Sequence, residues 1–201
     1  MQQYIPRKAL TNSEIRILKG AIEHLATKGY TKTSIGELSS LLGVSKGLIH
    51  YHFSSKEILF QETIAYIYAE ARRYMERQVW QTDNPWTQIQ TFISLSCQYY
   101  AAQGQLIKAL QEIRANFKPK QSASLAEVFS GNELSELEKV ITAGQSLGVF
   151  RTFDPAFGAL TLRMCLNGAA QKTIASTRPK QDANRHATEL IEMFRRAWTV
   201  M

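Results

Sequence analysis

The chain has 201 residues, a length that fits one large domain or two small ones. It is 44% hydrophobic and 20% charged, and no apolar run reaches the roughly 18 residues that span a bilayer. The net charge of +7 favours association with an anionic partner. The first ten residues, MQQYIPRKAL, lack the apolar segment of a signal peptide, so we expect a cytoplasmic protein without a membrane partner.

Apolar residues recur with helical spacing along almost the whole chain, which predicts an all-α protein of about nine helices. Thr11 with Glu14 and Ser34 with Glu37 fit capping boxes that open the first two helices. Further helix starts are expected at Ser45, at Ser54 with Glu57, at Asn84-Pro85 and at Asp154-Pro155. The first helix is expected to end at Gly29, and a turn is expected at Gly43. Breaks are expected at Gly104 and over residues 177–181, with a loop over residues 116–124 and a helix from Asn132 to Leu147.

The two short helices on either side of Gly43 differ from the others because the second exposes an unusual face. Successive helical residues are rotated by about 100°, so with Ile49 buried, Phe53 is also buried and Gly47 and Tyr51 point the opposite way. Leu48 and His50 flank these two residues. Two short helices joined by a glycine turn are typical of a helix-turn-helix, whose second helix enters the major groove of DNA.

The residue types on this face suit DNA. Gly47 permits close approach of the backbone, Leu48 fits a thymine methyl group, and Lys46 can donate to a guanine edge or a phosphate. The nearby helix starts offer backbone N–H groups to phosphates. The candidate DNA-binding residues are Thr33, Ser34, Ser45, Lys46, Gly47, Leu48, His50, Tyr51 and Lys56. Residues 1–60 contain eight Lys or Arg and four Asp or Glu, so more than half of the net charge lies there.

The run AIEHLATKGYTKTSIGELSSLLGVSKGLIHYHFSSKEILF resembles the DNA-binding domain of the TetR (tetracycline-repressor) family of transcriptional regulators. The resemblance implies a three-helix DNA-binding domain, residues 1–54, and a larger ligand-binding and dimerisation domain, residues 55–201. It also implies phosphate contacts by Thr33, Lys46, Tyr51 and Lys56. The chain departs from the family in having His50 where tyrosine is common.

The resemblance also implies a homodimer formed by the last two helices. The candidate interface residues are Phe157, Leu160, Met164, Gly168, Leu190, Ile191, Phe194 and Trp198. The wide apolar stripe of the last helix has to be covered. A second subunit is the expected cover, and the chain's own domain is the alternative.

A small-molecule effector is expected to bind between helices of residues 60–175. The candidate lining residues are Tyr66, Trp86, Phe92, Tyr99, Tyr100, Ile113, Phe117, Met164 and Asn167. The alternative for each of them is a place in the ordinary hydrophobic core. Arg114 and Arg163, in otherwise apolar helices, can receive a carboxylate or extend to solvent.

The sequence shows no catalytic constellation, so we expect no enzyme, no catalytic residue and no cofactor. His50 and His52 diverge on a helix, which argues against a metal site. Cys97 and Cys165 form no CxxC motif and are expected to be reduced core residues. The sequence therefore favours a ligand-responsive regulator, a repressor rather than an activator, that binds an inverted repeat in double-stranded DNA. A non-specific or architectural DNA-binding protein remains the main alternative, and a helical enzyme is a more distant one.

Overall fold

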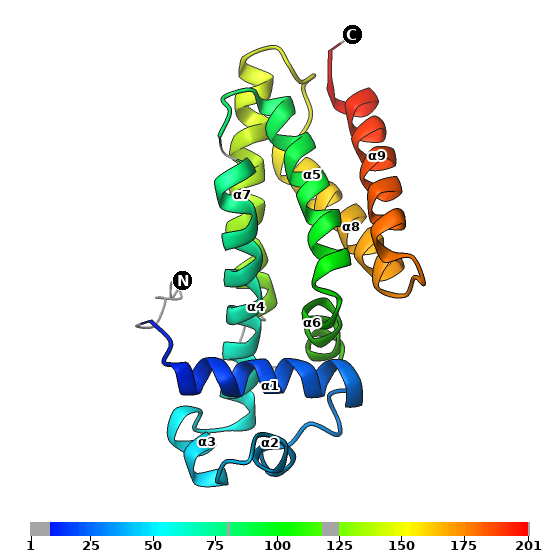
Figure 1. Ribbon diagram of the computed structural model, residues 1–201. Coiled ribbons are helices and arrows are strands. Elements are labelled where there is room, and N and C mark those ends of the chain that lie inside the picture. Colours follow the sequence, from blue (N-terminus) through cyan, green and yellow to red (C-terminus); the bar gives the residue numbers. More distant parts are fainter. Residues whose placement is uncertain (1–8, 80, 118–124, 201) are drawn as a thin grey trace. The chain divides into compact units, whose positions relative to one another are not determined.

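The computed structural model describes residues 9–79, 81–117 and 125–200, which form nine α-helices and a single isolated β-bridge (Figure 1). The helices are α1 (Asn12–Lys28), α2 (Ile35–Leu42), α3 (Lys46–His52), α4 (Lys56–Val79), α5 (Pro85–Ala102), α6 (Gly104–Asn116), α7 (Leu125–Ser146), α8 (Pro155–Ile174) and α9 (Pro179–Trp198). The expected all-α class is confirmed. None of the helices in these ranges is long and apolar enough to cross a membrane.

The chain forms two compact units. Unit 1 consists of Met1–Ala69 and Gln105–Phe129, and unit 2 consists of Glu70–Gly104 and Ser130–Met201. The helix-turn-helix segment therefore shares a unit with α6 and the first part of α4. The expected division after residue 54 concerns functional regions, and it stays a prediction.

Unit 1 is built around one apolar core. Leu18 and Leu25 from α1, Ile49 from α3 and Phe60 from α4 are fully buried in it, and Ile113 of α6 joins them. Helix α1 thus turns its apolar face towards this core. Leu41 of α2 is 49% exposed, because Leu38 and Leu42 occupy the face that meets the core.

In unit 2, α5 contacts both α8 and α9, and α8 also contacts α9 (Figure 1). The end of α9 packs in an aromatic cluster with the segment after α7: the Trp198 ring contacts the rings of Phe194, Phe150 and Phe153. Backbone hydrogen bonds from Arg151 to Trp198 and from Val200 to Val149 hold the chain end against this segment. The side of α9 that carries Phe194 and Trp198 is therefore buried within the unit.

Most of the expected helix boundaries are confirmed, and the exceptions have local causes. Ser55 caps α4 by accepting the N–H of Ile58, so the capping serine is one residue later than expected. Helix α7 begins at Leu125 rather than Asn132, because a helix tolerates an interior glycine such as Gly131 at a cost of about 1 kcal/mol. Of the expected loop, Asn116 still belongs to α6 and residues 118–124 lie outside the described residues.

Candidate nucleic-acid interface

The phase of α3 is as the sequence predicts. Ser45 caps the helix, accepting the N–H of Leu48 at 3.1 Å, and Ile49 and Phe53 are fully buried. The side chains of Lys46, Leu48, His50 and Tyr51 are exposed, as are Ser45 and Gly47. Tyr51 is 83% exposed and Leu48 38%. The helix therefore presents one continuous outward face, and the structure brings these six candidate residues together on it.

The turn between α2 and α3 is fixed by polar contacts to the backbone. Gly43 adopts the left-handed conformation with φ 62°, which glycine adopts without strain. The Arg16 guanidinium of α1 donates to the carbonyl of Leu42 at 2.6 Å, and the Ser39 hydroxyl donates to the carbonyl of Val44 at 2.6 Å. These contacts hold the outward face of α3 at a fixed angle to α2.

Lys46 extends over the first turn of α2. A Cβ atom on Gly36 would lie 3.3 Å from Cε and 3.5 Å from Nζ of Lys46, so the absence of a side chain at Gly36 makes room for the lysine. Ser34 begins the same turn, but its backbone N–H already donates to the carboxylate of Glu37 at 3.0 Å. The Lys46 ammonium therefore lies beside the start of α2.

Thr33 was expected to contact phosphate, and the structure corrects this. Its side chain is fully buried, and the hydroxyl donates to the carbonyl of Gly29 at 2.8 Å. Since its only proton is used there, the hydroxyl accepts from Nδ1–H of His24 at 2.9 Å. Thr33 ties the end of α1 to the start of α2 and has no side-chain atom left for DNA.

Lys56, at the start of α4, lies over two aromatic rings. Its Nζ is 4.7 Å from the centroid of Tyr30 and 5.2 Å from that of Phe60. Burial raises the pKa of Tyr30, and the charge of Glu57 raises it further. The ammonium is thus held in place by cation–π contacts, at a site the sequence assigned to phosphate binding.

Three polar residues outside the candidate DNA-binding set position this interface. Besides Arg16, Glu112 of α6 accepts the N–H of Tyr30 at 2.9 Å, just after α1 ends. His52 turns inward, with Nδ1 3.8 Å from Oε1 of Glu14 on α1. Glu112 is 82 residues from its partner, so no local sequence pattern could reveal it.

The candidate effector-binding residues divide between the two units. Tyr66, Ile113 and Phe117 belong to unit 1, where the first two are buried in the core and Phe117 packs against it. Unit 2 holds Trp86, Phe92, Tyr99, Tyr100, Met164 and Asn167. Met164 is 55% exposed, so it does not line an enclosed site within one chain. The other assignments stay predictions.

The two arginines noted in apolar helices both have partners. Arg114 donates to the hydroxyl of Tyr68 and lies over its ring within unit 1. Arg163 is only 9% exposed and forms an ion pair with Glu133 of α7 in unit 2. Neither side chain of this second pair reaches freely into solvent, so of the two alternatives for Arg163 the structure disfavours extension to water.

The candidate dimer residues fall into two groups. Phe157, Leu160, Met164 and Gly168 are exposed along one stripe of α8, and Leu190 and Ile191 of α9 are half-buried. Phe194 and Trp198 were expected at the interface, but they are 3% and 6% exposed within one chain. The aromatic cluster of unit 2 already covers them, so for these two residues the intrachain alternative is correct.

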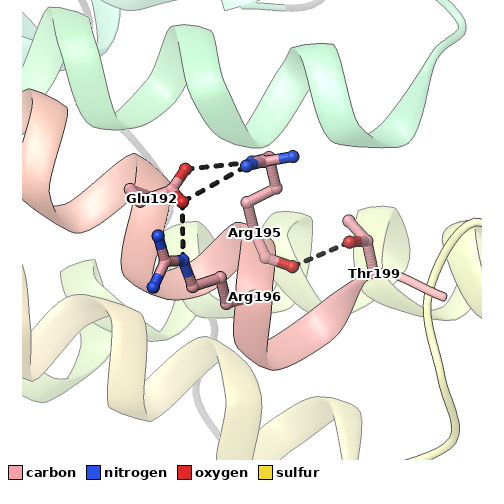
Figure 2. Close-up of polar contacts among 4 residues, drawn as sticks. All are labelled: Glu192, Arg195, Arg196 and Thr199. Atoms are coloured by element: carbon pink, nitrogen blue, oxygen red, sulfur yellow. Dashed lines mark hydrogen bonds and ion pairs between the residues drawn. The ribbon is translucent and has the colours of Figure 1, made fainter. Parts of the chain in front are cut away.

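The solvent-facing side of α9 is charged. Figure 2 shows the Glu192 carboxylate accepting hydrogen bonds from the guanidinium groups of Arg195 and Arg196, at 3.0 and 2.6 Å for the two Nε atoms. These hydrogen bonds, with the positive charges, lower the pKa of Glu192. This side of α9 is therefore polar, in contrast to the exposed stripe of α8.

Comparisons with known proteins agree with the geometry of α2 and α3. The family model of bacterial regulatory proteins of the tetR family matches residues 17–63. The HTH-type transcriptional repressor NicS of Pseudomonas putida is 26% identical over 137 residues, 67% of this chain and 64% of NicS. The chain thus matches less than two thirds of the length of this relative.

Solved structures share the fold over nearly the full length. A TetR-family regulator from Rhodococcus sp. superposes with a TM-score of 0.79 and 22% identity, covering 91% of this chain and 98% of that one. AibR, in complex with isovaleryl coenzyme A and operator DNA, superposes with a TM-score of 0.71 and 16% identity, covering 90% and 97%. Through residues 17–63, which hold the helix-turn-helix segment, the chain is similar to the tetR family of bacterial regulatory proteins.

Proposed function

We propose that the chain is a DNA-binding transcriptional repressor whose α3 enters the major groove. The observation that carries this proposal is the exposed face of α3, on which Lys46, Leu48 and Tyr51 point away from the buried Ile49. A leucine exposed on a short helix between a lysine and a tyrosine fits the edge of a base pair with phosphates on either side. The repressor function of the NicS relative supports the direction of regulation.

The contacts around α3 divide its residues by role. Lys46 lies over the first turn of α2 and Lys56 is held by aromatic rings, so both ammonium groups suit phosphates. Leu48 and the backbone at Gly47 are left to meet base edges. Base preference therefore rests on Leu48 more than on Lys46.

The chain acts as a homodimer in this proposal, through the exposed α8 stripe of Phe157, Leu160 and Met164. A two-fold dimer binds a two-fold site, so the operator is an inverted repeat. A small-molecule effector that prefers a conformation with a different spacing of the two α3 helices lowers the affinity for DNA, and DNA lowers the affinity for the effector by the same factor. AibR, which shares the fold, forms a complex with isovaleryl coenzyme A and operator DNA, and this supports a regulator that binds both a small molecule and DNA.

Selection of bound DNA from a random pool tests the proposal. We expect enrichment of one consensus with dyad symmetry, whose half-sites are separated by about one helical turn or a multiple of it. Recovery of DNA without any preferred sequence would indicate a non-specific or architectural binder. A consensus without dyad symmetry would contradict the dimeric arrangement.

A further inference from the structure

The ion pair between Arg163 of α8 and Glu133 of α7 lies in an apolar part of unit 2. On α8, the neighbouring Ala159, Leu162 and Leu166 are fully buried, and Leu137 follows Glu133 one turn later on α7 at 1% exposure. Arg163 itself is 9% exposed. A charged pair thus has buried aliphatic side chains as its neighbours along both helices.

Stability does not explain this pair. Removing two charges from water costs so much that a buried ion pair is commonly no more stabilising than apolar residues of the same size. Such a pair contributes well only when the remaining donors and acceptors of both groups are also satisfied. The arrangement around Arg163 and Glu133 does not meet that condition.

One atom on each side of the pair is sealed from solvent without a hydrogen bond. These atoms are Nε of Arg163, a donor, and Oε1 of Glu133, an acceptor, and neither has a partner within the ranges that the structure describes. Folded proteins satisfy about 90% or more of their buried polar groups through other protein groups or ordered water, so each exception needs an explanation. The pair therefore has one unused donor and one unused acceptor in an apolar environment, which is the composition of a ligand-recognition point.

We propose that Arg163 and Glu133 form the polar recognition point of the effector site and that they accept a neutral group with an acceptor beside a donor, such as a carboxamide or a lactam. This inference rests on the proposed control by an effector. Because the charges of the pair cancel, a neutral group satisfies both free atoms, whereas a carboxylate would be buried next to Glu133 without compensation. The Glu133 side chain is 24% exposed against 11% for Arg163, so the ligand approaches past Glu133.

The same reasoning predicts how one substitution changes the ligand class. Glu133→Gln removes the negative charge and leaves Arg163 as an uncompensated cation. The site then favours a carboxylate over a carboxamide. Glu136→Gln is the matched control, because Glu136 lies on the same helix, is 53% exposed and pairs with Lys139 at the surface.

The experiment uses the full chain labelled with ¹⁵N and follows the Nε–H resonance of Arg163. The signal is assigned by its loss in Arg163→Lys, which keeps the charge and lacks this N–H. If that variant fails to fold, the signal is assigned as the Nε–H resonance that shifts in Glu133→Gln. Acetamide and acetate are the probes, since they differ only in the group that meets the pair. We expect acetamide to shift the resonance with an affinity about tenfold or more above that of acetate. In Glu133→Gln we expect acetate to bind more tightly than acetamide. In Glu136→Gln we expect acetamide to bind more tightly, as in the unaltered chain.

A resonance that neither probe moves would overturn the proposal, because the pair would then be a purely structural contact. An order of affinities that Glu133→Gln leaves unchanged would overturn it as well. DNA affinity is measured in a separate titration without probes. A chain that binds acetamide at Arg163 but binds no DNA contradicts the proposed regulatory function and leaves the ligand site intact.

Discussion

A single buried hydroxyl joins the first helix to the start of the helix-turn-helix segment. Thr33 donates to the carbonyl of Gly29 and accepts from His24, and no solvent reaches it. The hydroxyl is therefore a structural group of unit 1, although its position just before α2 suggested a phosphate contact.

Thr33→Val should destabilise the fold while keeping the shape of the side chain. It leaves the Gly29 carbonyl and the His24 Nδ1–H without their partner, a loss of about 1–3 kcal/mol in the free energy of unfolding. Thr27→Val is the matched control, because the exposed Thr27 hydroxyl only bonds within α1, and it should change stability by less than about 0.5 kcal/mol. Urea unfolding measures both, and equal effects would show that the buried hydroxyl has no special role.

The two cysteines should differ in reactivity. Cys97 is fully buried, and burial raises the pKa of its thiol from 9.0 to about 11; Cys165 is half-buried and its pKa is raised by the same cause. The raised pKa means that above pH 9 the unfolded chain ionises first, so the free energy of unfolding should fall as the pH rises towards 11.

A thiol reagent at pH 8 checks the same assignment. It should modify Cys165 in the folded chain and Cys97 only after unfolding. Rapid modification of Cys97 in the folded chain would contradict its burial. In Cys97→Ala the loss of stability between pH 9 and 11 should become smaller.

The segment after α7 depends on a close approach between two elements of unit 2. A Cβ atom on Gly144 would overlap the ring of Phe150, and the Gly144 carbonyl accepts the N–H groups of Val149 and Phe150 at 2.8 and 3.0 Å. The glycine thus lets the chain fold back over α7, and Phe150 then reaches the aromatic cluster at the end of α9.

Gly144→Ala should therefore destabilise unit 2. We expect a loss of about 1–3 kcal/mol in the free energy of unfolding, because the methyl group displaces Phe150. Gly47→Ala is the control, since a Cβ atom there meets only ordinary contacts. The higher helix propensity of alanine should raise its free energy of unfolding by at most about 1 kcal/mol. Thermal unfolding distinguishes the two, and a Gly144→Ala protein as stable as the parent would show that Phe150 has room to move.

Elements were easier to predict from this sequence than burial. Capping residues such as Ser34 and Asn84 act on the next turn of chain, so their pattern is local and readable. The phase of α3 followed from one buried residue, Ile49. Burial of Thr33 and of Trp198 involves partners in other segments, His24 of α1 and Phe150 after α7, and local periodicity does not contain that information. The unsatisfied atoms of Arg163 and Glu133 are likewise visible only in three dimensions.

At the scale of the whole molecule, the exposed stripe of α8 predicts how two chains associate. Leu160 is 42% exposed between Phe157 and Met164, so Leu160→Glu should leave one chain folded and place a charge in the interface. We expect a monomer by light scattering with an unchanged circular dichroism spectrum. Phe194→Glu should unfold unit 2 instead, because Phe194 is buried within the chain. A Leu160→Glu protein that remains dimeric would show that another surface joins the chains.

The central claim is that the exposed face of α3 distinguishes DNA sequences. The most direct test is a titration of the parent chain and of Leu48→Ala on a selected site and on scrambled DNA, at two salt concentrations. Leu48→Ala should lose about 1 kcal/mol or more of binding free energy at its cognate base pair. Its free energy of unfolding should stay within about 0.5 kcal/mol of that of the parent. Leu41→Ala, which removes an exposed leucine of α2, is the control and should keep the preference for the selected site. If Leu48→Ala melts the fold and keeps the parent's ratio of affinities, Leu48 belongs to the core and α3 does not distinguish bases through it.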